Sequence, residues 1–410
     1  MNTTVLTALG KNKKIAAENL LFYVFVIAFF GAPLGTAPAT ICGITATIIW
    51  AVSGLGIRSR HIYFTKSWCW PVLLLMVLPW IGLLYTPDLH GLGMDYAGKT
   101  HYWIYGLAIA AIAPNVNNER FVQAFLLGLA VNACVGVMQL TGLYPPINGW
   151  YCGLGRGYST LSAYLVVGIL MASFYFRNAE EKKMGFFFIF LMLLYFFHLI
   201  ILPGRTGYFT FVLLSPLMVY TLFKKINIIK ILLVSVLLVG MMLVSPIVRN
   251  RISLSIDQLK YHTSVGQKSA WGKAYTAKQD RFYMWNGAVR IFKDHPFLGV
   301  GTGGYSTVLK KMGSPDDPII AHPHNDFLYM AVSYGLIGVA AFFWLFGEII
   351  KNAFTQRHNF LGFFVLSSTL VILVSGLFNA QILDAGMAFF LAVTVGLQQG
   401  FPQFKKPENR

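Results

Sequence analysis

The chain alternates between long apolar stretches and short polar connections over most of its length. Each stretch approaches the roughly 20 residues that span the hydrocarbon core of a bilayer as a helix. A membrane β-barrel would show shorter segments of alternating hydrophobicity, and runs such as ILLVSVLLVGMMLV do not alternate. The pattern predicts an all-α, polytopic membrane protein with about twelve transmembrane helices. These lie at about 16–34, 36–56, 68–86, 99–114, 120–140, 157–177, 184–203, 206–223, 229–247, 325–350, 359–379 and 384–400.

Composition supports the same class. Of the 410 residues, 56% are hydrophobic and 11% are charged, and the mean hydropathy is +0.61. A soluble domain averages about 25% charged residues. The first apolar stretch follows Lys11, Lys13 and Lys14, a pattern that a signal segment shares. We expect a retained helix, because little separates this stretch from the next one.

The basic residues predict the orientation. With a cytoplasmic N-terminus, the predicted helices place 18 of the 32 Lys and Arg residues inside. The short outer loops keep only Lys99, Arg156 and Arg205, and the remaining 11 fall in one long outer loop. Short inner loops enriched in Lys and Arg follow the positive-inside rule, from which long loops are exempt. Both termini are therefore expected in the cytoplasm, and the formal net charge of +17 does not require nucleic acid as a partner.

The long loop divides the expected membrane domain. Residues 1–247 hold the first nine predicted transmembrane helices, 248–322 form the outer loop, and 323–410 hold the last three helices and a cytoplasmic tail. Within the loop, apolar residues recur at helical spacing and the pattern stops before Pro296. The nearby bases suit an amphipathic helix in the headgroup plane. The apolar positions are Phe282, Trp285, Val289 and Phe292.

A glycine-rich segment, LGVGTGGY, follows that helix. Gly299, Gly301 and Gly304 satisfy a G-x-G-x-x-G spacing, but a dinucleotide site requires a preceding strand and a following helix in a βαβ unit. We interpret the segment as a flexible turn that lets the backbone approach a neighbour closely. No His, Cys or Glu cluster has the spacing of metal ligands, so we expect no cofactor and no metal.

The candidate chemistry lies at two predicted helix ends and in the loop helix. His322, His324, Asn325 and Asp326 directly precede the apolar run at 325–350. Asn and Asp are good helix N-caps, and the positive end of a helix dipole keeps a histidine there neutral and able to accept a proton. Two arginines on the predicted outer side also stand out: Arg205 in the short turn LPGRTGY and Arg281 at the start of the loop helix.

Together these residues resemble the O-antigen ligase and polymerase superfamily of bacterial inner membranes. The most specific match is His324-Asn325, nine spacer residues, and then Gly335 and Gly338. GRTGY and RFYMWNGAVRIFKDHPFLGVGTGGY are similar to two further blocks of the family. The matching motifs lie within roughly residues 200–400. The N-terminal third of the chain resembles the family only in its hydropathy pattern.

The resemblance implies an O-antigen ligase with a fold like GT-C-type glycosyltransferases. It would transfer a glycan from undecaprenyl pyrophosphate to a sugar hydroxyl of lipid A–core at the periplasmic face, in lipopolysaccharide biosynthesis. His324 would be the general base, while Arg205 and Arg281 would stabilise the pyrophosphate leaving group. The glycine pair would allow close helix packing. Further substrate-binding candidates are Asn325, Arg156, Arg290 and His322.

Three other functions are compatible with parts of this pattern. A polymerase of the same superfamily joins repeat units to one another, and the motif and the 410-residue length favour the ligase over it. A protein O-oligosaccharyltransferase usually carries an extra C-terminal region. A twelve-helix transporter places ionisable residues near the membrane midplane, whereas Glu348 and Asp384 stand near predicted helix ends.

Overall fold

The computed structural model describes residues 3–155, 157–223, 226–264, 281–313 and 319–402. Within these ranges the chain is helical, and the only β contact is an isolated bridge between Ile147 and Trp150. The predicted all-α fold class is confirmed.

Each of the twelve predicted apolar stretches contains one helix. These helices are α1 (Thr3–Gly31), α2 (Thr36–Val52), α5 (Cys69–Gly82), α7 (Tyr102–Ile112), α8 (Glu119–Leu140), α9 (Tyr158–Arg177), α10 (Lys182–Ile201), α11 (Arg205–Leu222), α12 (Ile228–Met242), α16 (Asp326–Thr355), α17 (Phe360–Gly376) and α18 (Ala385–Leu397). The others are α3 (Leu55–Arg58), α4 (Arg60–Phe64), α6 (Met94–Gly98), α13 (Pro246–Ser264), α14 (Arg281–Asp294) and α15 (Gly304–Met312). Short 3-10 or π turns are η1 (Leu89–Gly93), η2 (Lys99–His101), η3 (Ala113–Asn115), η4 (Gln381–Leu383) and η5 (Gln398–Gly400).

Several of these helices are able to span a membrane. Five have the required length and hydropathy, and the bent pair Ile228–Met242 and Pro246–Asp257, which meets at 98°, would make a sixth. Four shorter apolar helices, including those at Thr36–Val52 and Phe360–Gly376, have 10–17 residues. The chain is a membrane protein, and the number of twelve crossings stays a prediction.

The centre of the bundle is formed by α9, α17 and α18. The ring of Phe390 on α18 lies 5.1 Å from that of Phe125 and 5.0 Å from that of Tyr164, centroid to centroid. On the other side of α18, Gly106 of α7 packs directly against the backbone of Ala392. Small residues at such crossings let helix backbones approach closely, which is how membrane helices gain packing energy.

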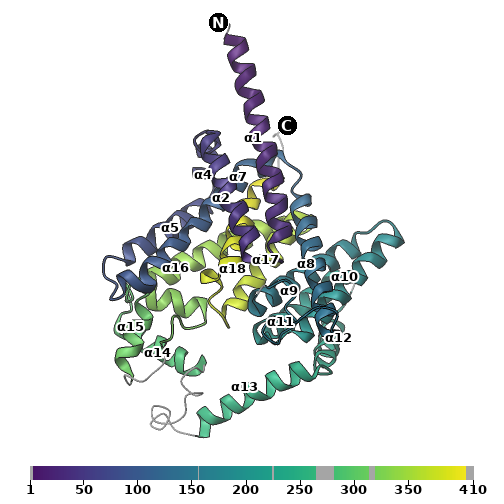
Figure 1. The fold of residues 1–410 in the computed structure, drawn as a ribbon, viewed down its shortest axis with the longest axis vertical. Coiled ribbons are helices and arrows are strands. Elements are labelled where there is room, and N and C mark those ends of the chain that lie inside the picture. Colours follow the sequence, from purple (N-terminus) through teal and green to yellow (C-terminus); the bar gives the residue numbers. More distant parts are fainter. Residues whose placement is uncertain (1–2, 156, 224–225, 265–280, 314–318, 403–410) are drawn as a thin grey trace.

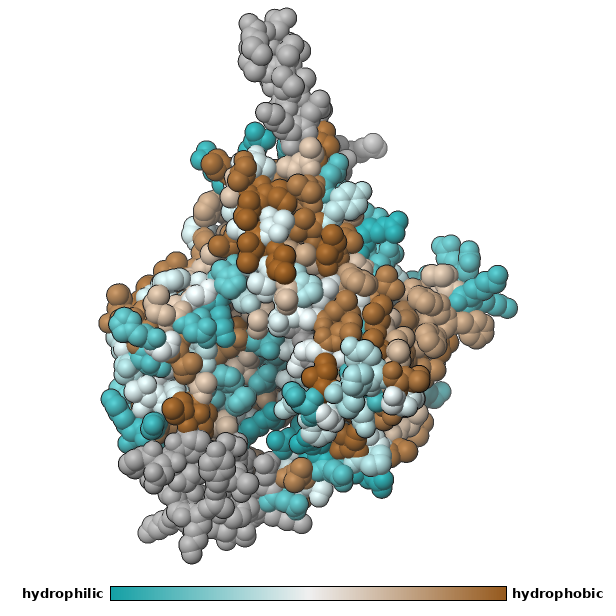
Figure 2. Space-filling model, viewed as in Figure 1, coloured by the Kyte–Doolittle hydropathy of each residue, from teal (hydrophilic) through white to brown (hydrophobic). Residues whose placement is uncertain are grey.

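The loop helices lie at one end of the molecule. In Figure 1, α13, α14 and α15 occupy the end opposite to the start of α1. Figure 2 shows hydrophobic side chains over much of the bundle and hydrophilic ones along a recess in the lower half of this face. The predicted site residues are on elements that meet near this end.

The predicted loop helix is present as α14, and it docks on the bundle. Its buried residues include Tyr283, Ala288 and Ile291, which form a small core with α15, and the Tyr305 hydroxyl of α15 donates to the Met284 carbonyl at 2.9 Å. The apolar face predicted from the sequence is only partly buried: Trp285 and Phe292 pack against this core, whereas Val289 is 39% accessible. Its contact with a membrane surface stays a prediction.

The glycine turn after α14 fits into a break in α16. Gly335 has φ +61° and ψ −150°, which interrupts the helix. The carbonyls of Val332 and Ser333 lose their helical partners there and accept the Val300 and Gly301 amides at 2.8 and 3.0 Å. In return, the Leu336 amide donates to the Pro296 carbonyl at 2.8 Å.

This break confirms one prediction and corrects another. The glycine turn does bring backbones close together, because Gly299 and Gly301 have φ of +66° and +81° and leave no room for a Cβ atom. Gly335, by contrast, was expected to admit a neighbouring helix. It admits a loop instead, since a Cβ atom there would collide with the Phe297 carbonyl.

Candidate active site

His324 stands in the turn that begins α16. Its φ is +49°, a left-handed conformation that is uncommon for a residue with a side chain. The next residue, Asn325, holds the turn: its Oδ1 accepts the Leu328 amide at 3.0 Å and its Nδ2 donates to the Leu377 carbonyl at 3.0 Å. Asn325 is therefore the N-cap. Conformations of this kind cost of order 1–3 kcal/mol and persist only where the surroundings fix them.

Asp326 anchors a second segment to the same turn. Its buried carboxylate accepts the Ile382 amide at 3.1 Å through Oδ1. Ile382 belongs to residues 377–384, the connection between α17 and α18, which we name the 377–384 loop. Asn325 and Asp326 thus both bond to the 377–384 loop and hold it next to the turn that carries His324.

The imidazole of His324 is oriented by Asn379, a residue of the 377–384 loop. Its Nδ1 lies 3.0 Å from Asn379 Oδ1, and Asn379 Nδ2 donates to Ser159 Oγ on α9 at 3.0 Å. An amide oxygen only accepts, so Nδ1 carries the proton. In the neutral ring, Nε2 then has the free lone pair that a general base requires.

Burial keeps this imidazole neutral. Desolvation lowers the pKa of His324, the hydrogen bond that Nδ1 donates to Asn379 opposes this effect, and the positive charge of Arg281 lowers the pKa further. The sequence predicted a neutral ring because of the helix dipole. The ring is neutral, but burial is the main cause.

His322 packs against His324. The two ring centroids are 4.3 Å apart, and His322 Nδ1 accepts the His324 amide at 3.2 Å. Burial, the neighbouring His324 and the charge of Lys99 lower the pKa of His322 to about 3. His322 is thus a neutral side chain at physiological pH, and its visible role is to hold the His324 backbone.

Arg281 lies between His324 and the start of α11. Its Nη2 donates to Thr206 Oγ1 at 3.5 Å, and its charge acts on the His324 pKa. Thr206 directly follows Arg205, which is the first residue of α11. The Nη1 of Arg205 donates to Ser255 Oγ at 3.0 Å. The structure therefore brings Arg205, Arg281 and His324, which are far apart in the sequence, to one region. Both arginine side chains are half-buried.

One other predicted residue is not brought into this group. Arg290 is exposed on α14, nine positions after Arg281, which corresponds to about 13 Å along the helix axis. Arg156 lies outside the described residues.

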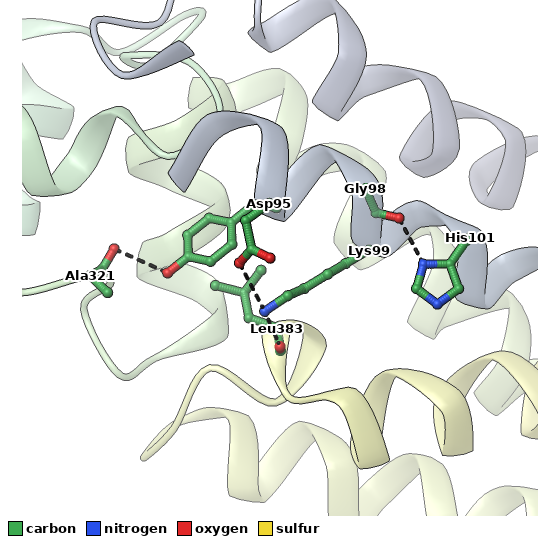
Figure 3. A network of polar contacts seen from close by, with 7 residues as sticks. Asp95, Gly98, Lys99, His101, Ala321 and Leu383 are labelled. Carbon is green, nitrogen blue, oxygen red and sulfur yellow. Dashed lines mark hydrogen bonds and ion pairs between the residues drawn. The ribbon is translucent and has the colours of Figure 1, made fainter. Parts of the chain in front are cut away.

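Lys99 is a cation near the site that was not selected from the sequence as a site residue. Its Nζ donates to the Leu383 carbonyl of the 377–384 loop at 2.9 Å and lies 3.6 Å from Asp95 Oδ2. Figure 3 shows the Lys99 side chain extending from its helix toward Leu383, and its Nζ lies 5.0 Å from the centroid of the Tyr96 ring. The Tyr96 hydroxyl donates to the Ala321 carbonyl at 3.4 Å, next to His322.

Asn379 was also missed. Its signal in the sequence is a polar residue in GLFNAQILD, a connection between two apolar stretches on the side predicted to face outward. Among the described residues, no three His, Cys, Asp or Glu side chains are grouped so as to hold a metal ion. The region combines a neutral imidazole with two guanidinium groups, an arrangement that can remove a proton from a hydroxyl beside an anionic leaving group.

The comparison with known families agrees with this chemistry. Residues 190–343 match the family described as O-Antigen ligase, and no curated protein matches the chain. The matched segment includes Arg205, Arg281, His322, His324 and the break at Gly335. Over this segment the chain is therefore similar to the O-antigen ligase family, whose members are glycosyltransferase-like enzymes.

Proposed function

We propose that the protein is an O-antigen ligase that works at the periplasmic face of a bacterial inner membrane. The donor would be a glycan on undecaprenyl pyrophosphate, and the acceptor a sugar hydroxyl of lipid A–core. The observation that carries the proposal is the His324 imidazole, held through Nδ1 by Asn379 and placed beside Arg281. The family match supports the class of reaction.

The reaction needs one proton acceptor and a site for negative charge. His324 Nε2 takes the proton of the acceptor hydroxyl as its oxygen attacks the anomeric carbon of the donor glycan. The bond between that carbon and the pyrophosphate oxygen breaks, and its electron pair leaves with the pyrophosphate. Arg281 and Arg205 stabilise the charge that develops there, because preorganised cations act most strongly on charge that forms in the transition state.

The arrangement of the chain supports the proposed orientation. The start of α1 lies at the end of the molecule opposite to α13, α14 and α15 (Figure 1). A cytoplasmic N-terminus, as the 18 inner and three outer basic residues of the short loops favour, would then direct the site toward the periplasm. The 248–322 loop would be periplasmic, and the polytopic segments on either side would form one membrane domain.

The test is a transfer assay with purified protein in lipid nanodiscs, supplied with undecaprenyl-pyrophosphate-linked glycan and lipid A–core. We expect glycan attached to lipid A–core as the product. We also expect its formation to fall by about 10²–10⁴-fold in His324→Ala, the range for loss of a general base.

Two controls make this assay decisive. Lys351→Met removes an exposed charge near the other end of α16 and should transfer normally. Donor-to-donor products, with the glycan chain extended on the lipid pyrophosphate, would show that the protein is the related polymerase. Full transfer by folded His324→Ala would remove His324 as the base.

A further inference from the structure

Lys99 is a basic residue that the proposed mechanism leaves unused. It is one of three basic residues in the predicted short outer loops, where the positive-inside pattern disfavours lysine. Of these three, Arg205 already has a role in the proposed mechanism, in which it stabilises the pyrophosphate together with Arg281. Lys99 therefore needs an explanation other than orientation of the chain.

Lys99 approaches the histidine pair at His322, because its neighbour Tyr96 donates to the Ala321 carbonyl and the Lys99 charge acts on His322. The charge of Arg281 acts on His324 instead. Lys99 belongs to η2, between α6 and α7, whereas Arg205 and Arg281 are the first residues of α11 and α14. Lys99 and His324 are nevertheless fastened to the same segment, because Leu383 and Asn379 both belong to the 377–384 loop.

An apolar cavity begins at Lys99. The concave space between α5, α7, α16 and α18 is narrow, with a volume of about 70 Å³, and it is partly open to the outside. Lys99 and Thr100 supply polar groups at its wall. Its apolar lining includes Leu78, Trp103, Leu345, Phe346 and Leu391. A cation beside an apolar cavity is complementary to an amphiphile with an anionic headgroup.

The contacts of Lys99 leave it able to bind such a group. Its ion pair with Asp95 spans 3.6 Å, and the Asp95 side chain is 61% exposed. Exposed pairs of this kind contribute only about 0–1 kcal/mol. A phosphate could replace Asp95 while the bond to the Leu383 carbonyl remains.

The direction of the reaction indicates which substrate this side receives. In an inverting displacement, the nucleophile and the leaving group stand on opposite faces of the sugar ring. If the arginines hold the leaving pyrophosphate, the hydroxyl approaches the base from the side away from them. We take this to be the side of His322 and Lys99, because the Arg281 charge acts on His324 and the Lys99 charge acts on His322.

We infer that Lys99 and the apolar cavity beside it form the acceptor subsite, which binds a phosphate group of the acceptor glycolipid at the ammonium and part of its hydrocarbon in the cavity. This inference rests on the proposed function. It adds a second cationic position to the site, with a role distinct from that of the two arginines.

The experiment compares Lys99→Met with the wild type on two acceptors, lipid A–core with its phosphates and the same lipid A–core after enzymatic dephosphorylation. With the phosphorylated acceptor we expect the acceptor KM to rise about tenfold in Lys99→Met, the scale of one partly exposed charge-assisted contact. The donor KM should stay unchanged. With the dephosphorylated acceptor, wild type and variant should differ by less than about twofold, because the partner of Lys99 is then absent.

Lys99→Arg should keep most of the preference for the phosphorylated acceptor, and Lys351→Met should behave as the wild type. Equal losses on both acceptors would show that Lys99 only supports the 377–384 loop, and would overturn the inference. A rise in donor KM instead would assign the cavity to the polyprenyl chain. A wild type without any lipid A–core product would contradict the proposed function itself, which separates the two failures.

Discussion

Two histidines, the fully buried His198 in α10 and the half-buried His324 at the start of α16, show how differently this bundle uses one side chain. His198 is fully buried, and its Nε2 lies 2.9 Å from the Tyr151 carbonyl. A carbonyl only accepts, so His198 carries its proton on Nε2. His324 has the opposite arrangement, because Asn379 holds the proton on Nδ1 and leaves Nε2 as the acceptor.

The surroundings explain the difference in use. The His198 ring fills the space beside Gly136 of α8, where a Cβ atom would collide with it. It is a packing residue between helices. His324 stands in a turn, half-buried, next to the charge of Arg281. A histidine becomes useful for proton transfer here when a fixed partner takes one nitrogen and a substrate is able to reach the other.

The largest predicted effect separates the two histidines directly. His324→Ala should lower transfer by about 10²–10⁴-fold while thermal unfolding in detergent changes little. His198→Ala should instead destabilise the protein by about 2–3 kcal/mol, because it leaves a cavity and an unpaired Tyr151 carbonyl. Its folded fraction should retain normal kcat. Equal losses of activity in the two folded variants would remove the distinction.

Arg281 should carry the next largest effect. Arg281→Ala is expected to reduce kcat by about 10²–10³-fold, the loss seen when a preorganised charge-stabilising group is removed. The Arg281 charge lowers the pKa of His324, so its loss raises that pKa. Since the base acts in its neutral form, the acid limb of the pH–rate profile should move to higher pH. Arg281→Lys should move the limb less, and a shift to lower pH would contradict the placement of Arg281.

Two glycines of α16 provide a matched test of the helix break. Gly335→Ala should destabilise the protein by about 1–3 kcal/mol, because Gly335 has φ +61° and faces the Phe297 carbonyl. Gly347→Ala, in the same helix, meets no atom within 4 Å and should be neutral or slightly stabilising. Thermal unfolding and hydrogen exchange at residues 296–303 would measure both, and a tolerated Gly335→Ala would show that the break is not needed.

Asn379 should give the smallest of these effects, through positioning. Asn379→Ala is expected to lower kcat about tenfold, the lower end of the range for a group that orients a functional histidine. Asn379→Asp should move the acid limb to higher pH, because a carboxylate favours the imidazolium. Asn352→Ala removes a comparable amide near the other end of α16, where it bonds to Gln398 at 3.2 Å, and should leave the pH profile unchanged. An unchanged profile in Asn379→Asp would exclude the bond to His324.

The sequence predicted the helices and the main candidate residues. Hydrophobic length located the apolar helices to within about five residues at each end, because burial in lipid requires long uninterrupted runs. The exception is the start of α1, which lies at Thr3 and not near residue 16. Pattern and motif together selected Arg205, Arg281 and His324, which the structure brings to one region. The N-cap role of Asn325 followed from its place before an apolar run.

The remaining features depend on contacts between distant segments. Asn379 reaches His324 across 55 positions, and Leu383 reaches Lys99 across 284, so no local pattern links them. The break at Gly335 exists because the 296–301 segment supplies its hydrogen bonds. The buried face of α14 was likewise decided by its contacts with α15 and α16, since periodicity alone identifies an apolar face but not its partner.

The central claim is that the His324 imidazole is neutral and unprotonated at Nε2. It is tested most directly by ¹⁵N NMR of the histidine-labelled protein in lipid at pH 7. His324→Gln and His198→Gln would assign the two signals. We predict that His324 carries its proton on Nδ1 and that His198 carries its proton on Nε2. A His324 ring protonated on Nε2, or on both nitrogens, would contradict its role as the base.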